Sequence, residues 1–412
     1  MKIQPTSYAL LAALAVAGSA CDNHVLVGDT PDGSVTGAAG GTSTGTAGAS
    51  VPSTGSGGGT GTVTRVVKPL GISGQEAITR ITAVIWNDKP DADLTQQAAQ
   101  GHFTSTSDLY DAIRQVLADP RAANGVGAFY RWWLELRTVA TLMKDAQLYP
   151  TFTPALQADM ANESETFGVK VTLDLNGTYG MLMTAPMSFI NARLADLYGV
   201  ANVQGDALGQ VDLDPQQRAG LLTQPAILAL RSGLTSTNPS SRGTYVDEKF
   251  FCMPIPPPPS GAVRPVPPPI GAGVTARQEL AALLATNPAC ISCHSLIDPP
   301  GLAFENFDAI GHWRTTDNGG QVDVSGLRLI NVVDPAVTVN GPIELATVVA
   351  QAPTAQNCMV RQWEAFVLGK ANVDALDANL DLSDAYAVFK ATGFNLKELI
   401  VSVLTTDAFL AP

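Results

Sequence analysis

Apolar residues recur every three or four positions along most of the chain after residue 70, which is the period of an amphipathic helix. The first stripe is formed by Ile78, Ile81 and Ile85, and residues 73–76 before it have the pattern of a capping box. Pro90 marks the end of this helix. The same period predicts further helices at residues 109–117, 127–139, 154–172, 188–198, 226–230, 242–251, 275–286, 343–350, 358–368, 383–391 and 396–409.

Alternation of apolar and polar positions, which is typical of strands, is confined to one part of the chain. Residues 321–324, 328–333 and 336–339 alternate weakly and predict a small β-hairpin. Two short segments rich in polar residues or proline, 174–179 and 298–301, predict turns. The pattern as a whole predicts a mostly α fold, in which a multi-helical body carries one small hairpin.

A separate apolar run lies near the N-terminus, where Tyr8–Ala17 follows the positive charge of Lys2. This run is shorter than the ~20 apolar residues that span a bilayer, so it predicts a signal peptide over residues 1–20. Small residues directly precede Cys21, which resembles the lipidated cysteine of a bacterial lipoprotein. Ordinary secretory cleavage after Ala20 and an uncleaved anchor are the alternatives.

Residues 28–64 consist almost entirely of Gly, Thr, Ser, Ala and other residues with small side chains. Such a segment cannot bury enough apolar surface to offset its chain entropy. We therefore expect residues 21–66 to form a flexible, lipidated tether between a membrane and the folded body.

Composition narrows the possible functions. Hydrophobic residues make up 45% of the chain, which is enough for a real core, and the aromatic residues of segment 127–139 are expected to lie in it. The formal net charge is −13 without a basic block, so nucleic acid is not an expected partner. The acidic charge indicates a solvated surface, with a docking face for a basic partner as the alternative.

The segment with the clearest chemistry is Cys290-Ile291-Ser292-Cys293-His294. Two thiols three residues apart, followed by a histidine, are typical of c-type haem attachment, in which the thiols form thioethers and the histidine binds iron. A redox dithiol and half of a zinc site are the alternatives. A zinc site needs two more ligands at fixed spacing, and the sequence contains no second Cys/His pair. We therefore predict a cytochrome c-like domain with one covalently attached haem c.

Residues after the pentapeptide are candidates for contact with the haem. The carbonyl of a proline such as Pro299 is expected to accept the Nδ1 proton of His294. Phe304, together with Leu302 and Phe307, is expected to cover a haem face. Trp313 and Arg314 are candidates for holding a propionate, because arginine pairs well with carboxylates; ordinary packing and a surface charge are the alternative for this pair.

The second iron ligand is less clearly marked. Met359 is the first candidate, because a Met/His pair is a common ligand set in cytochromes. His312 and Met253 follow, His102 is a further weak candidate, and iron without a second protein ligand would favour catalysis.

Two cysteines, Cys252 and Cys358, remain outside the pentapeptide and the N-terminal segment. In an oxidising compartment they are expected to form a disulfide, with a buried free thiol as the alternative. Between Cys252 and the pentapeptide, the proline runs 254–259 and 265–269 predict polyproline II, either as a stiff strap or as a docking strip.

Many segments after residue 70 resemble a family of exported bacterial cytochrome c-like proteins with consecutive domains of unknown function, of the 1592, 1588 and 1585 types. The resemblance is carried by residues 80–90, 119–122, 133–134, 189–199, 218–224, 241–243, 252–259, 287–314, 366–370 and 394–409. It implies an exported mono-haem protein without an assigned reaction.

Pattern and resemblance together predict three folded regions after the tether. They are an N-terminal helical domain (67–205), a middle domain with the proline strap and haem site (206–320), and a C-terminal helical domain packing on the haem region (321–412). The predicted function is electron transfer by a membrane-tethered cytochrome in the periplasm or at the cell surface, with an unidentified redox protein as partner. A haem enzyme acting on peroxide or an organic substrate, and an interaction protein with structural haem, are the alternatives.

Overall fold

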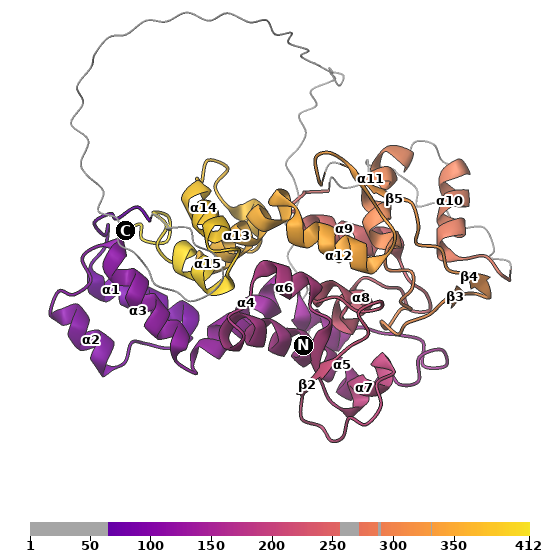
Figure 1. Cartoon of the computed structure of the whole chain (residues 1–412), viewed down its shortest axis with the longest axis horizontal. Coiled ribbons are helices and arrows are strands. Elements are labelled where there is room, and N and C mark those ends of the chain that lie inside the picture. The colour runs from indigo at the N-terminus through magenta and orange to yellow at the C-terminus, as the bar shows by residue number, and fades with distance from the viewer. Residues whose placement is uncertain (1–64, 256–271, 287–289, 331) are drawn as a thin grey trace, which may run out of the picture. The chain divides into compact units, whose positions relative to one another are not determined.

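The computed structural model describes residues 65–255, 272–286, 290–330 and 332–412 (Figure 1). The predicted signal peptide, Cys21, nearly all of the predicted tether and both proline runs apart from Pro254 lie outside the described residues. Within the described ranges, no helix is both long and apolar enough to cross a membrane. The described part of the chain is mostly α, as the sequence predicts, and the strands in it form only small two-stranded sheets.

The first four helices begin where the sequence supplies a capping side chain or follows a tight turn. Ser73, Asp91 and Ser105 each accept a backbone N–H three residues ahead, and Ser105 forms a reciprocal capping box with Asp108. The helices are α1 (Gly74–Ile85), α2 (Ala92–Ala99), α3 (Thr106–Ala118) and α4 (Ala122–Trp133). Helix α2 was not predicted, because its eight residues bury only Leu94 and so show little periodicity.

The next segment corrects one prediction. Helix 188–198 begins instead as a strand, β1 (Met187–Ile190), which pairs antiparallel with β2 (Gly209–Asp212). All four β1 residues are buried, so the run lacks the alternation that indicates a strand. Asn191 then caps α7. The elements around it are η1 (Leu136–Thr141), α5 (Pro154–Val169), the π-helical turn η2 (Lys170–Asp174), α6 (Tyr179–Thr184) and α7 (Ala192–Tyr198).

Within the described residues, the middle of the chain contributes one 3-10 helix, four α-helices and a small hairpin. They are η3 (Leu221–Thr223), α8 (Pro225–Leu230), α9 (Pro239–Phe250), α10 (Ala276–Thr286), α11 (Ile291–Leu302), β3 (Thr316–Asp317) and β4 (Gly320–Gln321). Strands β3 and β4 pair antiparallel.

The last region contains the predicted hairpin, in which β5 (Leu327–Leu329) pairs antiparallel with β6 (Val337–Val339). The following helices are α12 (Pro342–Gln351), α13 (Pro353–Val367), η5 (Val373–Ala375), α14 (Ser383–Ala391) and α15 (Leu396–Val403). Helix α15 ends before Phe409, earlier than the apolar pattern indicates.

The hydrophobic core joins segments that are far apart in the sequence. Phe129 of α4 stacks on Trp363 of α13 with ring centroids 3.8 Å apart, and Trp133 of α4 also stacks on Phe129, at 5.6 Å. Helices α3 and α15 are in contact as well. At the surface of the same contact, Glu398 of α15 pairs with Arg114 at 3.0 Å and with Arg65. The aromatic cluster near residue 130 is therefore core, as predicted.

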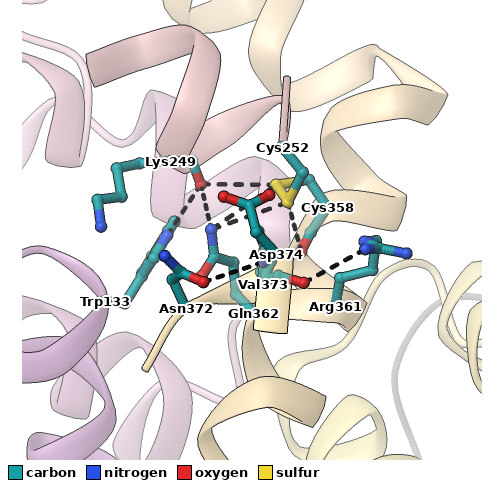
Figure 2. Close-up of a disulfide and its surroundings, with 9 residues drawn as sticks. All are labelled: Trp133, Lys249, Cys252, Cys358, Arg361, Gln362, Asn372, Val373 and Asp374. Atoms are coloured by element: carbon teal, nitrogen blue, oxygen red, sulfur yellow. Dashed lines mark hydrogen bonds between the residues drawn. A yellow bond between two sulfur atoms is a disulfide. The ribbon is translucent and has the colours of Figure 1, made fainter. Parts of the chain in front are cut away.

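A disulfide links the end of α9 to α13 (Figure 2). Cys252 and Cys358 are bonded with an S–S distance of 2.02 Å, which is the predicted pairing. Beside it, the carbonyl of Lys249 accepts hydrogen bonds from Trp133 Nε1 and Gln362 Nε2, each at 3.0 Å (Figure 2). The disulfide and these bonds together fix the C-terminal end of α9 against α4 and α13.

Removing this disulfide is expected to destabilise the protein substantially. The bond closes a loop with a sequence separation of 106 residues, and bonds of this kind contribute ~2–5 kcal/mol, chiefly by constraining the unfolded chain. A Cys252→Ser/Cys358→Ser variant should therefore unfold at lower urea concentration than the wild type. The wild type under reducing conditions is the matched control and should move to the variant's midpoint. Equal midpoints for all three samples would show that the bond contributes nothing.

Candidate functional site

Helix α11 (Ile291–Leu302) begins directly after Cys290, carries the rest of the Cys290–His294 pentapeptide in its first turn, and packs directly against α9. Two glycines allow their backbones to meet. A Cβ added to Gly243 of α9 would lie 1.6 Å from the carbonyl oxygen of Ile297, and one added to Gly301 of α11 would lie 1.7 Å from that of Pro239. Any side chain at these positions would force the helices apart. The α9–α11 contact therefore holds the pentapeptide against the folded body.

The predicted turn at 298–301 is wrong, because these residues belong to α11. Pro299 and Pro300 lie inside the helix, where each removes a backbone donor. Sequence rules therefore place the end of the helix before them. The helix nevertheless continues through both prolines. Gly301 lies against α9, and the N–H of Ala303 donates to the carbonyl of Pro299 at 3.3 Å.

The pentapeptide presents its reactive side chains together. Cys290 immediately precedes α11, so Cys290, Cys293 and His294 follow the i, i+3, i+4 spacing that places residues on one helix face. Both thiols are free, with Cys290 half-buried and Cys293 exposed. Ile291 between them is 46% exposed. The face that carries the thiols is thus open to a large group.

His294 is oriented through one ring nitrogen. Its Nδ1 lies 3.0 Å from each carboxylate oxygen of Asp298, one turn further along α11. Ser240 of α9 donates to Asp298 Oδ1 at 2.7 Å, and its oxygen lies 3.4 Å from Nδ1. When Asp298 is ionised its carboxylate only accepts hydrogen bonds, and Nδ1 then carries the proton while Nε2 keeps its lone pair. This is the tautomer that a histidine ligand with Nε2 on a metal requires.

The carboxylate of Asp298 corrects the prediction for Pro299. The carbonyl of Pro299 accepts the N–H of Ala303 within the helix, and the Nδ1 proton goes to Asp298. The prediction failed because a helix continuing through residue 298 places an i+4 side chain under His294, whereas a turn would present a backbone carbonyl. Burial raises the pKa of Asp298, and its hydrogen bonds with Ser240 and its interactions with His294 act in the opposite direction.

Helix α10 contains no buried residue, and three residues separate its last residue, Thr286, from Cys290. It is anchored at its N-terminal end, where the backbone N–H of Ala276 donates to Asp317 Oδ2 at 2.7 Å and Arg277 pairs with Asp323 at 3.1 Å. Leu280 and Leu284 are only half-buried. An isolated helix of this length is marginal in water, so an apolar partner would stabilise it.

Two free thiols, an oriented imidazole and a nearby helix with partly exposed leucines fit a haem.

The other residues predicted to contact a haem also make contacts within the fold. Phe304 and Phe307 are buried, and the ring of Phe307 meets that of half-buried Trp313 edge-on at 5.2 Å. Arg314 donates to Asp317 Oδ1 at 2.6 Å and to Glu305 Oε2 at 2.9 Å. The roles of Phe304, Trp313 and Arg314 toward a haem stay predictions, and Arg314 would have to leave a carboxylate to bind a propionate.

Sequence reasoning missed a buried ion pair that fixes the segment after α11. Arg242 of α9 donates to the carbonyls of Phe304 and Phe307 at 3.0 Å and to that of Asp308 at 2.6 Å. Its partner Glu305 is equally buried, 3.6 Å away, and accepts from Thr237 at 2.8 Å. Burial lowers the pKa of Arg242 to about 10, and the charge of Glu305 opposes this. The only signal in the sequence was that Arg242 lies in a segment carrying the family resemblance.

The candidates for a second iron ligand lie in different settings. Met359 is 1% exposed and belongs to the hydrophobic core, Met253 is half-buried, and His102 and His312 are exposed. The contacts of Met359 are those of a core side chain, so its role as an iron ligand stays a prediction. Among the described residues, no group of three or more His, Cys, Asp or Glu side chains is arranged to hold a metal ion.

Comparison with protein families identifies two domains in the chain. Residues 72–200 match PSD4, described as a protein of unknown function (DUF1592), and residues 218–317 match PSCyt3, a protein of unknown function (DUF1588). No curated protein and no solved structure matches the chain. The predicted resemblance is confirmed for these two cytochrome c-like domains, and the pentapeptide lies in the second. A third domain of the 1585 type stays a prediction.

Proposed function

We propose that this chain, which carries the DUF1592 and DUF1588 domains of a cytochrome c-like family, is a mono-haem c-type cytochrome that transfers electrons outside the cytoplasm. One observation carries the proposal. Cys290, Cys293 and His294 share one face at the start of α11, with both thiols free and the imidazole held through Nδ1.

Three residues of the pentapeptide have defined roles in this proposal. The thiols of Cys290 and Cys293 form the two thioether bonds, and Nε2 of His294 binds the iron. The haem supplies a reversible one-electron couple when bound. The protein would orient His294, the half-buried leucines of α10 would be available to pack against the porphyrin, and the exposed Cys293 side would stay accessible to a partner.

Export and membrane attachment belong to the same proposal. Covalent haem attachment takes place outside the cytoplasmic membrane, so the signal peptide and the lipidated Cys21 predicted from the sequence are consistent with the site. The partner is an unidentified redox protein in the periplasm or at the cell surface. Recovery of the full-length chain in the membrane fraction supports the lipid anchor, and recovery only in a soluble extract would contradict it.

Haem attachment is expected to depend strictly on the two thiols of the pentapeptide. In a host that matures c-type cytochromes, the full-length wild type should retain haem stain on a denaturing gel, and Cys290→Ala/Cys293→Ala should retain none. A Ser292→Ala/Ser295→Ala variant is the matched control, because it changes two exposed residues of the same helix and keeps both thiols. Stain that persists in the cysteine variant, or is absent from the wild type, would contradict the proposal.

The visible spectrum of the same wild-type protein separates electron transfer from catalysis. A low-spin spectrum that does not respond to cyanide or peroxide is expected for electron transfer. A high-spin spectrum that changes with these ligands would replace this proposal with a haem enzyme.

A further inference from the structure

Asp298 and Ser240 form a hydrogen-bonded pair behind His294, and two independent elements build it. Asp298 is 4% exposed and reaches Nδ1 from the next turn of α11. Ser240 comes from α9 and donates to the same carboxylate at 2.7 Å. The Gly243–Gly301 backbone contact fixes the distance between the two helices. The partner of Nδ1 is therefore a buried carboxyl group whose position the fold determines.

We propose that Asp298 is a positioning residue that lowers the reduction potential of the site through His294, and that Ser240 moderates this effect. The inference rests on the proposed attachment of haem to the pentapeptide. It goes further by stating how two residues outside the pentapeptide shift the reduction potential.

The physical reason is the charge of the acceptor. Hydrogen bonds to an ionised carboxylate are roughly twice as strong as those between neutral groups. A carboxylate therefore draws the Nδ1 proton away from the ring more strongly than a backbone carbonyl would, and Nε2 becomes the better electron donor. Ferric iron gains more from a strong donor than ferrous iron does, so the oxidised state is favoured and the potential is lowered.

Ser240 acts in the opposite direction. Its hydroxyl donates to Asp298 Oδ1, the oxygen that also lies 3.0 Å from Nδ1 of His294. A second donor on the same oxygen withdraws part of the negative charge available to the imidazole. Removing the hydroxyl should strengthen the bond between Asp298 and His294. Substitutions at the two residues should therefore shift the reduction potential in opposite directions.

A redox titration of the full-length haem protein tests the inference. Asp298→Asn should raise the reduction potential by at least about 59 mV, which corresponds to a tenfold change in the ferric/ferrous ratio of a one-electron couple. Ser240→Ala should lower the potential by a smaller amount. Asp111→Asn is the charge-matched control, since its side chain is 92% exposed on α3, and its potential should equal that of the wild type.

The outcomes separate this inference from the proposed function. If Asp298→Asn holds covalent haem at an unchanged potential, the inference is overturned and haem attachment stands. If Asp298→Asn fails to mature, Ser240→Ala decides: a lowered potential supports the inference, and an unchanged or raised potential overturns it. A purely structural role would reduce haem content without the two opposite shifts. Wild-type protein without haem would overturn the inference and the proposed function together.

Discussion

Gly301→Ala is expected to lower the free energy of unfolding by at least about 3 kcal/mol, which is at the upper end of the effects of overpacking. The reason is the α9–α11 contact, where the added Cβ would lie 1.7 Å from the carbonyl oxygen of Pro239 and 2.7 Å from the backbone nitrogen of Gly243. Neither neighbour is a flexible side chain, so a helix has to move. Helix propensity alone predicts the opposite sign, because alanine stabilises a helix interior by about 1 kcal/mol relative to glycine.

Gly180→Ala is the matched control for this prediction. Gly180 also lies in a helix, α6, but an added Cβ there would meet only Thr178 Oγ1, at an ordinary 3.6 Å. Urea denaturation of both variants should show strong destabilisation for Gly301→Ala and none for Gly180→Ala. Gly243→Ala should behave like Gly301→Ala, since its Cβ would lie 1.6 Å from the carbonyl oxygen of Ile297. If Gly301→Ala is as stable as the control, α9 and α11 do not pack as described.

Asp247→Asn is expected to stabilise the protein at pH 8 and to have little effect at pH 4. Asp247 lies on α9 and is fully buried, and neither carboxylate oxygen has a hydrogen-bond partner within the described part of the chain. Burial raises the pKa of Asp247 to about 8, and the charge of Glu248 adds to this. The folded state therefore holds the neutral acid, which asparagine resembles in size and charge.

The sign follows from the two pKa values. The folded carboxyl has a pKa of about 8, above the ordinary value of 3.8 for an exposed group, so its stabilising effect is complete below pH 4 and is lost as the pH rises to 8. Each pKa unit corresponds to about 1.4 kcal/mol, so the shift sets an upper limit of about 6 kcal/mol, which local water penetration reduces. We expect a gain of at least about 2 kcal/mol at pH 8.

Chemical denaturation at several pH values measures this effect. The wild type should lose stability between pH 4 and pH 8, with Glu163 and Glu364 contributing in the same direction because burial raises the pKa of each to about 7. The difference between Asp247→Asn and the wild type should grow with pH, whereas Asp111→Asn, a change at an exposed carboxylate, should give no such growth. A difference that is constant with pH would show that Asp247 is ionised in the folded protein.

Local sequence signals predicted much of the fold. Ser73 at the start of α1 and the apolar spacing of Ile78 and Ile81 depend only on neighbouring residues, and both were correct. Strand β1 was missed because a strand buried on both faces lacks alternation. The contact between Gly243 and Gly301 was also missed, because a glycine inside a helix gives no indication of which distant helix approaches it.

For the candidate site, too, the local pattern could be predicted from the sequence, whereas the contacts made through tertiary packing could not. The spacing of Cys290, Cys293 and His294 is local, and it was enough to mark the pentapeptide as the candidate site for haem attachment. Asp298 was read as part of a turn, because two prolines follow it, although its i+4 spacing from His294 was visible. Ser240 lies 54 positions from His294, and only the tertiary packing of α9 brings it to the site.

The intact mass of the mature wild-type protein, made in a host that matures c-type cytochromes, is the most direct test of haem attachment at α11. The account predicts a coloured protein whose mass exceeds that of the processed, lipid-bearing or lipid-free polypeptide by one haem. A colourless protein whose mass contains no haem would contradict it.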